Sequence, residues 1–336
     1  MQLQLKKYRL QLKHTFTISR ESHDFQDSIV VGLSEDSVTG YGESTSNPYY
    51  NITQGSLENE INTVRNEIEK HEFTNPDNFY ELLNSLELTN FAKCALDLAA
   101  NDLYGKLLGK PLYKIWGTSS YKYPITNFTI GIADVDTMVA KMKEQPWPIY
   151  KIKLGTADDV ALVTELRKHT DAIFRVDANC AWSAEETIQN SSALKDLGVE
   201  FIEQPLKASN WEGMRSVINA SQLPIIADES CILPEDVSKC HGHFTGINIK
   251  LTKCGGLTPA RKMITEARSL DLKVMVGCMT ESSVGISAIA QLTPQLDYVD
   301  MDGALLLKED IASGIQINAD GSLIFPKTGG SGIHLL

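Results

Sequence analysis

The segment Tyr150-Lys151-Ile152-Lys153-Leu154-Gly155 carries two lysines one residue apart in otherwise apolar surroundings. This pattern is typical of a β-strand, in which alternate side chains point to the same side, so that Lys151 and Lys153 share one face. Two ammonium groups on one inward face repel each other. The sequence therefore predicts either carboxylates that compensate these lysines or a function that uses them.

Three acidic residues and a further lysine end strand-like segments downstream. Asp177, Glu203, Asp228 and Lys250 each lie roughly 25 residues after the preceding group, about one strand and one helix. Three carboxylates on successive strands form a set of hard oxygen ligands that suits Mg²⁺. The alternative is an ion-pair network between these carboxylates and the lysines.

Lysine can act as a base at neutral pH only when its pKa is lowered. A free lysine has a pKa of about 10.4 and is protonated at neutral pH, whereas a neighbouring ammonium or a divalent cation disfavours the charged form. We expect Lys151 to lower the pKa of Lys153 in this way. A metal-bound carboxylate substrate would then have a proton-transfer group on each face of its α-carbon, Lys153 on one and Lys250 on the other.

The elements that must position these groups alternate between short apolar strands and helical patterns. The predicted strands span residues 124–130, 149–154, 172–177, 199–203, 223–228, 245–250, 272–278 and 296–300. Eight such units favour a parallel (β/α)8 barrel over a doubly wound sheet, and no glycine-rich phosphate fingerprint follows any of them. The charged groups lie at the carboxyl ends of their strands, where barrel enzymes carry catalytic residues, so we expect them to converge on one mouth.

The rest of the chain predicts an α+β N-terminal domain, with a β-hairpin or meander over 28–42 and helices at 55–70, 76–87 and 92–108. We divide the chain into residues 1–121, a barrel over 122–312, and a segment 313–336 that returns to the N-terminal domain. Helix starts in the barrel are expected at a Ser183 capping box and at Thr258-Pro259, an N-cap followed by proline.

Composition excludes several classes of function. The chain has 336 residues and a formal net charge of −12, which disfavours nucleic-acid binding because phosphates attract basic surfaces. It shows neither a signal-peptide pattern nor an apolar run of about 18 residues, so no membrane span is expected. Six cysteines without zinc-like spacing indicate reduced thiols and a cytoplasmic protein.

Together these motifs resemble the enolase superfamily, in its muconate-lactonising subgroup. Gly40-Tyr41-Gly42-Glu43 and the stretch from Ala95 to Tyr113 are similar to the signatures of its capping domain and first linker, and Lys151-Ile152-Lys153 is similar to its KxK motif. The resemblance implies a modified TIM barrel with a capping domain that the C-terminal segment completes. It also implies Mg²⁺ on Asp177, Glu203 and Asp228, two lysine bases, Lys153 and Lys250, and an enediolate stabilised by Mg²⁺ and Lys151.

Within this subgroup, Asp300-Met301-Asp302 is similar to the DxD motif of dipeptide epimerases. Asp300 and Asp302 would hold the α-ammonium of a dipeptide, although Asp302 could instead cap a helix or shape a turn. The implied activity is epimerisation of L-Ala-D/L-Glu at its C-terminal residue, in murein peptide recycling. Arg20 and His23, in a loop expected over 14–25, are candidates for the glutamate side-chain carboxylate.

Other functions remain open at this point. A muconate cycloisomerase or an o-succinylbenzoate synthase would use the same scaffold on a substrate without an ammonium group. Acid-sugar dehydration is disfavoured because the sixth strand offers Lys250 and no His–Asp pair is visible. A non-catalytic carboxylate-binding barrel would have no need of two opposed lysines. The sequence leaves the oligomeric state open, a homo-oligomer included.

Overall fold

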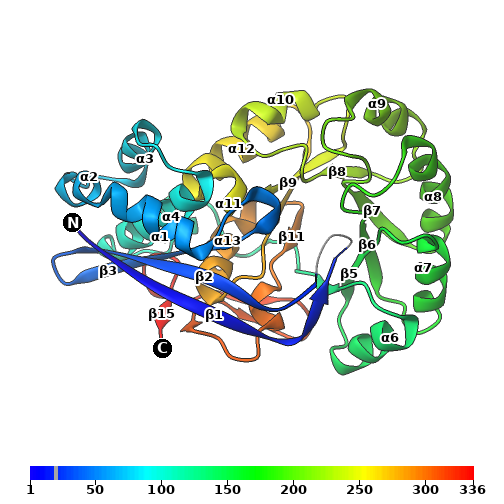
Figure 1. The fold of residues 1–336 in the computed structure, drawn as a ribbon, viewed down its shortest axis with the longest axis horizontal. Coiled ribbons are helices and arrows are strands. Elements are labelled where there is room, and N and C mark those ends of the chain that lie inside the picture. The colour runs from blue at the N-terminus through cyan, green and yellow to red at the C-terminus, as the bar shows by residue number, and fades with distance from the viewer. Residues whose placement is uncertain (19–21) are drawn as a thin grey trace.

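The larger part of the molecule is a parallel β-barrel. The computed structural model describes residues 1–18 and 22–336. Within these ranges, an eight-stranded sheet runs in the order β11-β10-β9-β8-β7-β6-β5-β4 (Figure 1). A parallel bridge between Thr126 and Val299 joins its two edges and closes the barrel. The strands are β4 (Phe128–Ile130), β5 (Ile149–Lys153), β6 (Ile173–Asp177), β7 (Val199–Glu203), β8 (Ile225–Ala227), β9 (Gly246–Lys250), β10 (Lys273–Gly277) and β11 (Tyr298–Asp300). All eight lie within the predicted segments, so the predicted fold class is confirmed.

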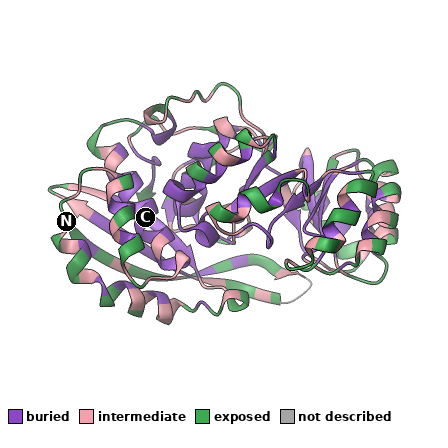
Figure 2. Ribbon diagram, turned by 90° about the horizontal axis from the view of Figure 1, so that it is seen from above, coloured by how far each residue is buried: buried purple, intermediate pink, exposed green. Residues whose placement is uncertain are grey.

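Helices follow the barrel strands and cover their outer side (Figure 2). The buried residues of α12, among them Leu257, Ala260 and Met263, form an apolar stripe along the helix. Ser183 and Glu186 form the expected capping box of α8. These helices are α6 (Val135–Glu144), α7 (Asp159–Arg167), α8 (Ala184–Asp196), α9 (Trp211–Ala220), α10 (Val237–Cys240), α11 (Leu251–Cys254), α12 (Leu257–Ser269) and α13 (Ser283–Leu292), with 3-10 turns η2 (Pro234–Asp236), η3 (Thr293–Gln295) and η4 (Gly303–Leu306).

The predicted start of α12 is wrong. The helix begins at Leu257, with Gly256 as its N-cap at a φ of 122°, so that Pro259 is its third residue. Asp97 from the N-terminal domain supplies the capping acceptor instead, taking hydrogen bonds from the amide of Thr258 at 2.9 Å and its hydroxyl at 2.6 Å. A carboxylate distant in sequence thus replaces the local cap.

The N-terminal domain packs helices on an antiparallel sheet in the order β1-β2-β3. Its strands are β1 (Gln2–Thr17), β2 (Ser22–Glu35) and β3 (Val38–Thr45). Its helices are α1 (Gln54–Thr63), α2 (Arg65–Lys70), α3 (Pro76–Ser85), α4 (Asn90–Leu107) and α5 (Leu112–Ile115), with the 3-10 turn η1 (Pro48–Tyr50). The helix predicted over 55–70 is interrupted at Val64, between α1 and α2. Of the segment expected to be a loop over 14–25, residues 14–17 and 22–25 belong to β1 and β2, the two strands of a long hairpin that extends toward the barrel (Figure 1).

The C-terminal segment contacts the N-terminal domain. The amide of Ser331 donates to Asp102 of α4 at 2.8 Å, and the amide of Leu112 donates to the carbonyl of Gly330 at 3.1 Å. Ile333 packs in a small core with Val30 of β2. Short strands β12 (Ala312–Ser313), β13 (Gln316–Ile317), β14 (Leu323–Ile324) and β15 (His334–Leu335) form two antiparallel pairs here. The segment thus adds contacts that complete the capping domain, while the boundaries at residues 121 and 312 stay predictions.

The barrel interior is divided into a polar and an apolar part just below the strand ends. In β5, β6 and β9, the residues two positions before the charged ends are Lys151, Arg175 and Asn248, and all are buried. On the remaining interior wall, Phe201, Ile226 and Met275 form a separate apolar cluster with Tyr298 packed against it. Strand periodicity carries both sets inward together with the residues at the strand ends.

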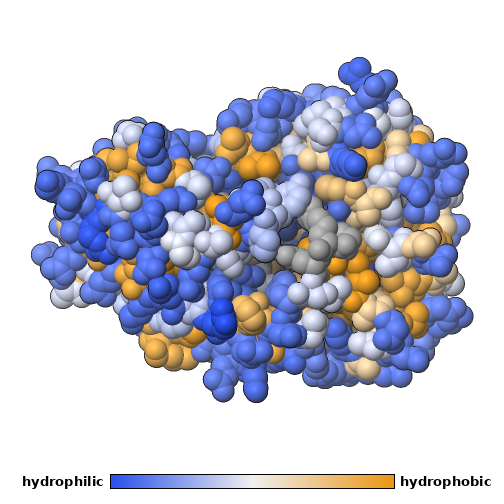
Figure 3. All heavy atoms as spheres, viewed as in Figure 1, coloured by the Kyte–Doolittle hydropathy of each residue, from blue (hydrophilic) through white to orange (hydrophobic). Residues whose placement is uncertain are grey.

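The molecular surface seen in Figure 3 is mostly hydrophilic, with hydrophobic residues in scattered groups. No helix in residues 1–18 and 22–336 is long and apolar enough to cross a membrane. The six cysteines are free thiols, and four of them are buried.

Two buried carboxylates meet where the capping domain touches the barrel. Glu43 of β3 accepts hydrogen bonds from Ser28, Ser282 and Gly285, and so caps the N-terminus of α13 from the other domain. Burial and the nearby Glu43 raise the pKa of Glu281 to about 8, although the amide of Met279 and the charge of Lys250 act in the opposite direction.

Glu281→Gln should therefore change how stability depends on pH. A carboxyl with a raised folded pKa binds an extra proton in the native state between its unfolded value, near 4.5, and about 8. The wild type should lose stability relative to the variant as pH rises through this range, by on the order of a few kcal/mol, and the difference should level off above pH 8. Urea unfolding of both proteins from pH 5 to 9 measures it. Parallel pH profiles would contradict the assignment.

Candidate active site

A cleft of about 500 Å³ lies between the capping domain and the mouth of the barrel. Phe16, Phe25 and Tyr50 of the capping domain line one side. The barrel contributes charged residues to its floor, namely Lys153, Asp228, Lys250, Lys253, Asp300 and Asp302. The strand-end groups thus lie together in the cleft, as the sequence predicts. They come from β5, β8, β9 and β11 or from the residues that follow these strands.

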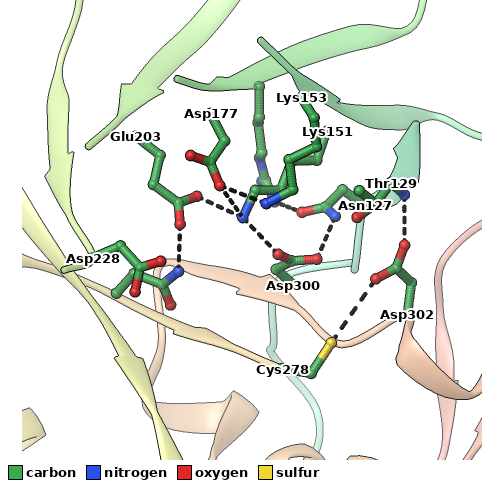
Figure 4. A network of polar contacts seen from close by, with 12 residues as sticks. Asn127, Thr129, Lys151, Lys153, Asp177, Glu203, Asp228, Cys278, Asp300 and Asp302 are labelled. Carbon is green, nitrogen blue, oxygen red and sulfur yellow. Dashed lines mark hydrogen bonds and ion pairs between the residues drawn. The ribbon is translucent and has the colours of Figure 1, made fainter. Parts of the chain in front are cut away.

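The three predicted metal ligands form one buried cluster. Asp177 ends β6, Glu203 ends β7, and Asp228 directly follows β8. Each offers a carboxylate oxygen, and these oxygens all lie within 4.8 Å of one another. The amide of Asn179 holds Asp177 at 2.9 Å, and the side-chain amide of Asn248 holds Glu203 at 2.7 Å. Figure 4 shows the carboxylates of Asp177 and Glu203 turned toward Lys151.

Lys151 lies among three carboxylates. Its Nζ is 2.7 Å from Glu203 Oε2, 2.8 Å from Asp300 Oδ2 and 3.3 Å from Asp177 Oδ2 (Figure 4). Burial by itself lowers the pKa of this ammonium, but the three carboxylates outweigh burial and raise its pKa well above the ordinary value. Lys151 is therefore a fixed positive charge in this structure.

The expected repulsion between the two lysines of β5 is relieved by a shared partner. Lys153 Nζ lies 2.7 Å from Asp177 Oδ2, the same oxygen that Lys151 approaches. One carboxylate oxygen thus lies between the two ammonium groups. This contact supplies the compensation that the pattern of lysines required.

Lys250 ends β9 and pairs with the opposite side of the cluster. Its Nζ lies 3.1 Å from Asp228 Oδ2, and its pKa is raised because the attraction of Asp228 exceeds the opposing effect of burial. In the ring of strands, β5 and β9 are separated by three strands on either side. Lys153 and Lys250 therefore approach the cleft floor from opposite walls, as predicted.

The lysines divide the acidic cluster electrostatically. The pKa of Asp228 lies below its ordinary value because Lys250 and Lys253 outweigh the effect of burial. Burial and the neighbouring Asp177 raise the pKa of Glu203 to about 7, despite the opposing charge of Lys151. The lysines therefore stabilise the negative charge of Asp228 more than that of Glu203.

Asp300 and Asp302 also line the cleft, and Asp300 lies next to the carboxylate cluster because both contact Lys151. Asp300 accepts hydrogen bonds from Asn127 at 2.7 Å and Lys151 at 2.8 Å, whereas Asp302 accepts from the amide of Thr129 at 2.5 Å. Burial and the charge of Asp300 raise the pKa of Asp302 to about 7. The Asp302 side chain makes no capping bond to η4, which removes the N-cap interpretation.

Sequence reasoning missed several polar residues of this site. Lys253, on α11, donates to both a side-chain oxygen of Asp228 at 2.5 Å and its carbonyl at 2.6 Å. Arg175 and Asn248 lie on the interior wall two residues before Asp177 and Lys250. The same two-residue spacing that identified Lys151 beside Lys153 would have indicated both.

The two candidates for contact with a side-chain carboxylate of the substrate are His23 and Arg20. His23 lies in β2, is half-buried and lines the cleft, with its ring 5.8 Å from that of Phe16. Arg20 lies outside the described residues.

The carboxylate cluster fits a divalent cation. Three carboxylates from adjacent strands, buried and aimed at one point, form the hard-oxygen donor set that Mg²⁺ prefers. In the present structure the lysines neutralise these carboxylates, so the predicted ion-pair network and a metal site use the same residues.

The chain matches family models in two parts. Residues 3–117 match the mandelate racemase/muconate lactonizing enzyme N-terminal domain, and residues 134–336 match a model described as enolase C-terminal domain-like. A protein from Maribacter sp. (strain HTCC2170 / KCCM 42371), named L-Ala-D/L-amino acid epimerase, is 69% identical over 335 residues, covering 100% of this chain and 99% of that protein.

Solved structures of related proteins have the same overall fold. The dipeptide epimerase from Cytophaga hutchinsonii, complexed with Mg and the dipeptide D-Ala-L-Val, superposes with a TM-score of 0.95 at 25% identity, covering 100% of this chain and 96% of that chain. The N-succinyl Arg/Lys racemase from Bacillus cereus ATCC 14579 superposes with a TM-score of 0.88 at 26% identity, covering 99% and 95% of the two chains.

Proposed function

Since the chain belongs to the mandelate racemase/muconate lactonizing enzyme family of the enolase superfamily, we propose that it is an Mg²⁺-dependent dipeptide epimerase. The observation that carries this proposal is the pairing of two opposed lysines, Lys153 and Lys250, with the carboxylates Asp300 and Asp302 in one cleft. The relative named L-Ala-D/L-amino acid epimerase and the solved dipeptide epimerases support it.

The charged groups of the cleft favour one orientation of a bound dipeptide. The C-terminal carboxylate would lie at the cluster of Asp177, Glu203 and Asp228, and the α-ammonium would lie at Asp300 and Asp302. The α-carbon of the C-terminal residue then lies between Lys153 and Lys250. A bound Mg²⁺ would supply positive charge that stabilises the negative charge developing on the substrate carboxylate.

Epimerisation requires one lysine to take the α-proton and the other to return one from the opposite face. We assign these roles to Lys153 and Lys250, which exchange them when the direction of reaction reverses. Lys151, fixed by three carboxylates, keeps a positive charge beside the reacting carboxylate and is not itself a base. These assignments of residues are part of the proposal.

Asp302→Asn should lower kcat/KM for dipeptides about 100-fold, mainly through KM, because a charge-assisted contact to the substrate ammonium is lost. The measurement is α-proton exchange in D₂O for a panel of L-Ala-L-Xaa dipeptides by ¹H NMR. Asp171→Asn, an exposed residue before β6 at the far end of the barrel, is the matched control. Unchanged kinetics in Asp302→Asn would refute the ammonium site.

The alternative activities differ in the need for an ammonium group. A muconate cycloisomerase or an o-succinylbenzoate synthase acts on substrates without one, and would tolerate Asp302→Asn. A non-catalytic binding barrel would bind carboxylates without any α-proton exchange. Exchange on the dipeptide panel therefore identifies an epimerase, and a parallel assay with substrates that lack an ammonium group separates a cycloisomerase or synthase from a non-catalytic barrel.

We further propose that the enzyme acts in the cytoplasm on dipeptides of the L-Ala-D/L-Glu type released from cell-wall peptides. The name of the Maribacter relative supports a broader range of second residues. Deletion of the gene should lead to accumulation of such dipeptides, measured by mass spectrometry of cell extracts. A homo-oligomer is a further prediction, which light scattering tests.

A further inference from the structure

Asp300 is held at both of its carboxylate oxygens. Lys151 donates to Oδ2 at 2.8 Å, and the side-chain amide of Asn127 donates to Oδ1 at 2.7 Å (Figure 4). Asn127 is completely buried and lies directly before β4. Two residues later, the amide of Thr129 holds Asp302 at 2.5 Å. The short segment 127–129 therefore orients both carboxylates.

Arg175 determines which way the amide of Asn127 points. Its guanidinium donates to Asn127 Oδ1 at 3.3 Å and to the carbonyl of Val299 at 3.2 Å. Guanidinium nitrogens can only donate, so they require the oxygen of the amide to face them. The NH₂ group of Asn127 is then directed to Asp300, which can only accept.

Arg175 is itself fixed by residues of the neighbouring strand β7 and of β11. Its Nε donates to Glu200 at 2.8 Å, and the guanidinium lies 5.4 Å and 5.1 Å from the ring centroids of Phe201 and Tyr298. It is buried in the interior wall just below the strand ends. A continuous chain of contacts thus runs from Glu200 through Arg175 and Asn127 to Asp300.

We propose that Asn127, oriented by Arg175, is a positioning residue that fixes Asp300 for recognition of the substrate ammonium. The inference rests on the proposed function, because it needs a substrate with an ammonium group. Asn127 contributes no charge, so it restrains Asp300 without weakening the negative potential that attracts the ammonium. Its loss leaves Asp300 attached to Lys151 alone and free to rotate away from the cleft.

The test compares ligands with and without the ammonium group. Binding of L-Ala-L-Glu and of N-acetyl-L-Ala-L-Glu is measured by titration calorimetry in the presence of Mg²⁺. In Asn127→Leu, a variant with the same branching and number of side-chain heavy atoms, the affinity for the free dipeptide should fall roughly 10- to 100-fold while that for the acetylated one changes less than about twofold. If turnover is detected, KM should rise and kcat should change little.

Arg175→Lys supplies an independent test that keeps the buried charge. It loses the planar donor pair that orients the amide, so it should reduce dipeptide affinity in the same selective way, roughly tenfold. Equal losses for both ligands, or no loss in either variant, would overturn the inference. If the wild type binds the dipeptide but exchanges no α-proton, the epimerase assignment fails while these affinities still decide the role of Asn127.

Discussion

The Lys250→Ala variant should lose epimerisation by a factor of about 10³ or more, because one of the two proton-transfer groups is removed from the cleft. The loss should be one-sided. The epimer whose α-proton faces Lys153 should still exchange that proton with D₂O, without inversion, because Lys153 remains on β5 with its partner Asp177. NMR of the exchange, combined with chiral analysis of the product, separates the two processes.

Lys273→Ala is a suitable control for this variant, since Lys273 is an exposed lysine at the start of β10 and pairs with Asp297 at the surface. It should retain wild-type activity. Normal epimerisation in Lys250→Ala, or loss of exchange for both epimers with equal magnitude, would contradict the two-base arrangement.

Removal of divalent cations with a chelator should abolish α-proton exchange and leave the protein folded. The carboxylate cluster needs positive charge, and Lys151, Lys153, Lys250 and Lys253 supply it by ion pairs when no divalent cation is bound. Saturating Mg²⁺ at about 100 times its Kd adds only about 2.7 kcal/mol of stability. Chelation should therefore lower the Tm by roughly 5 °C.

Activity should return when Mg²⁺ is added back to the chelated enzyme. Calorimetric melting and exchange rates, measured on the same samples before and after chelation, check both parts. Full activity in the chelator would show that the cluster acts through its ion pairs alone. Unfolding on chelation would show that the four lysines do not stabilise the metal-free cluster.

The barrel and the centre of its site could be predicted because their signals are local. A buried strand has a simple apolar pattern, and a charged residue at its end stands out against that pattern, as Asp228 does after Ile225-Ile226-Ala227. Once the eight strands are assumed to be parallel, their carboxyl ends must meet. The convergence of the charged groups at six strand ends could therefore be predicted from the sequence, without information on tertiary contacts.

Contacts between distant parts of the chain could not be predicted in this way. Asp97 caps α12, and Glu43 caps α13, although each lies in the other domain. The predicted helix start at Thr258-Pro259 relied on a local pattern, because those residues have the right types at the right spacing. The acceptor from α4 displaced that arrangement, since a buried carboxylate at a helix N-terminus satisfies several donors at once.

The partners of individual charges were also beyond the sequence. Lys151 was expected to act on Lys153 by repulsion, whereas its main neighbours are Glu203 and Asp300. Lys151 shares the interior wall with Arg175 and Asn127, which are hydrogen-bonded to each other. Which side chains meet inside a barrel depends on the register between strands, and the alternation within a single strand does not specify that register.

The bridge between Thr126 and Val299 has a consequence for biosynthesis. It lies at the seam of the barrel, beside the contacts of Asn127 and Lys151 with Asp300, and the lysine is separated from that aspartate by 149 positions. At about 5–20 residues per second, the ribosome needs roughly 7 to 30 s to produce the intervening chain. The nascent chain thus lacks one of the three carboxylates that surround Lys151 until its last barrel strand emerges, so the proposed ammonium site and the closed barrel are completed together.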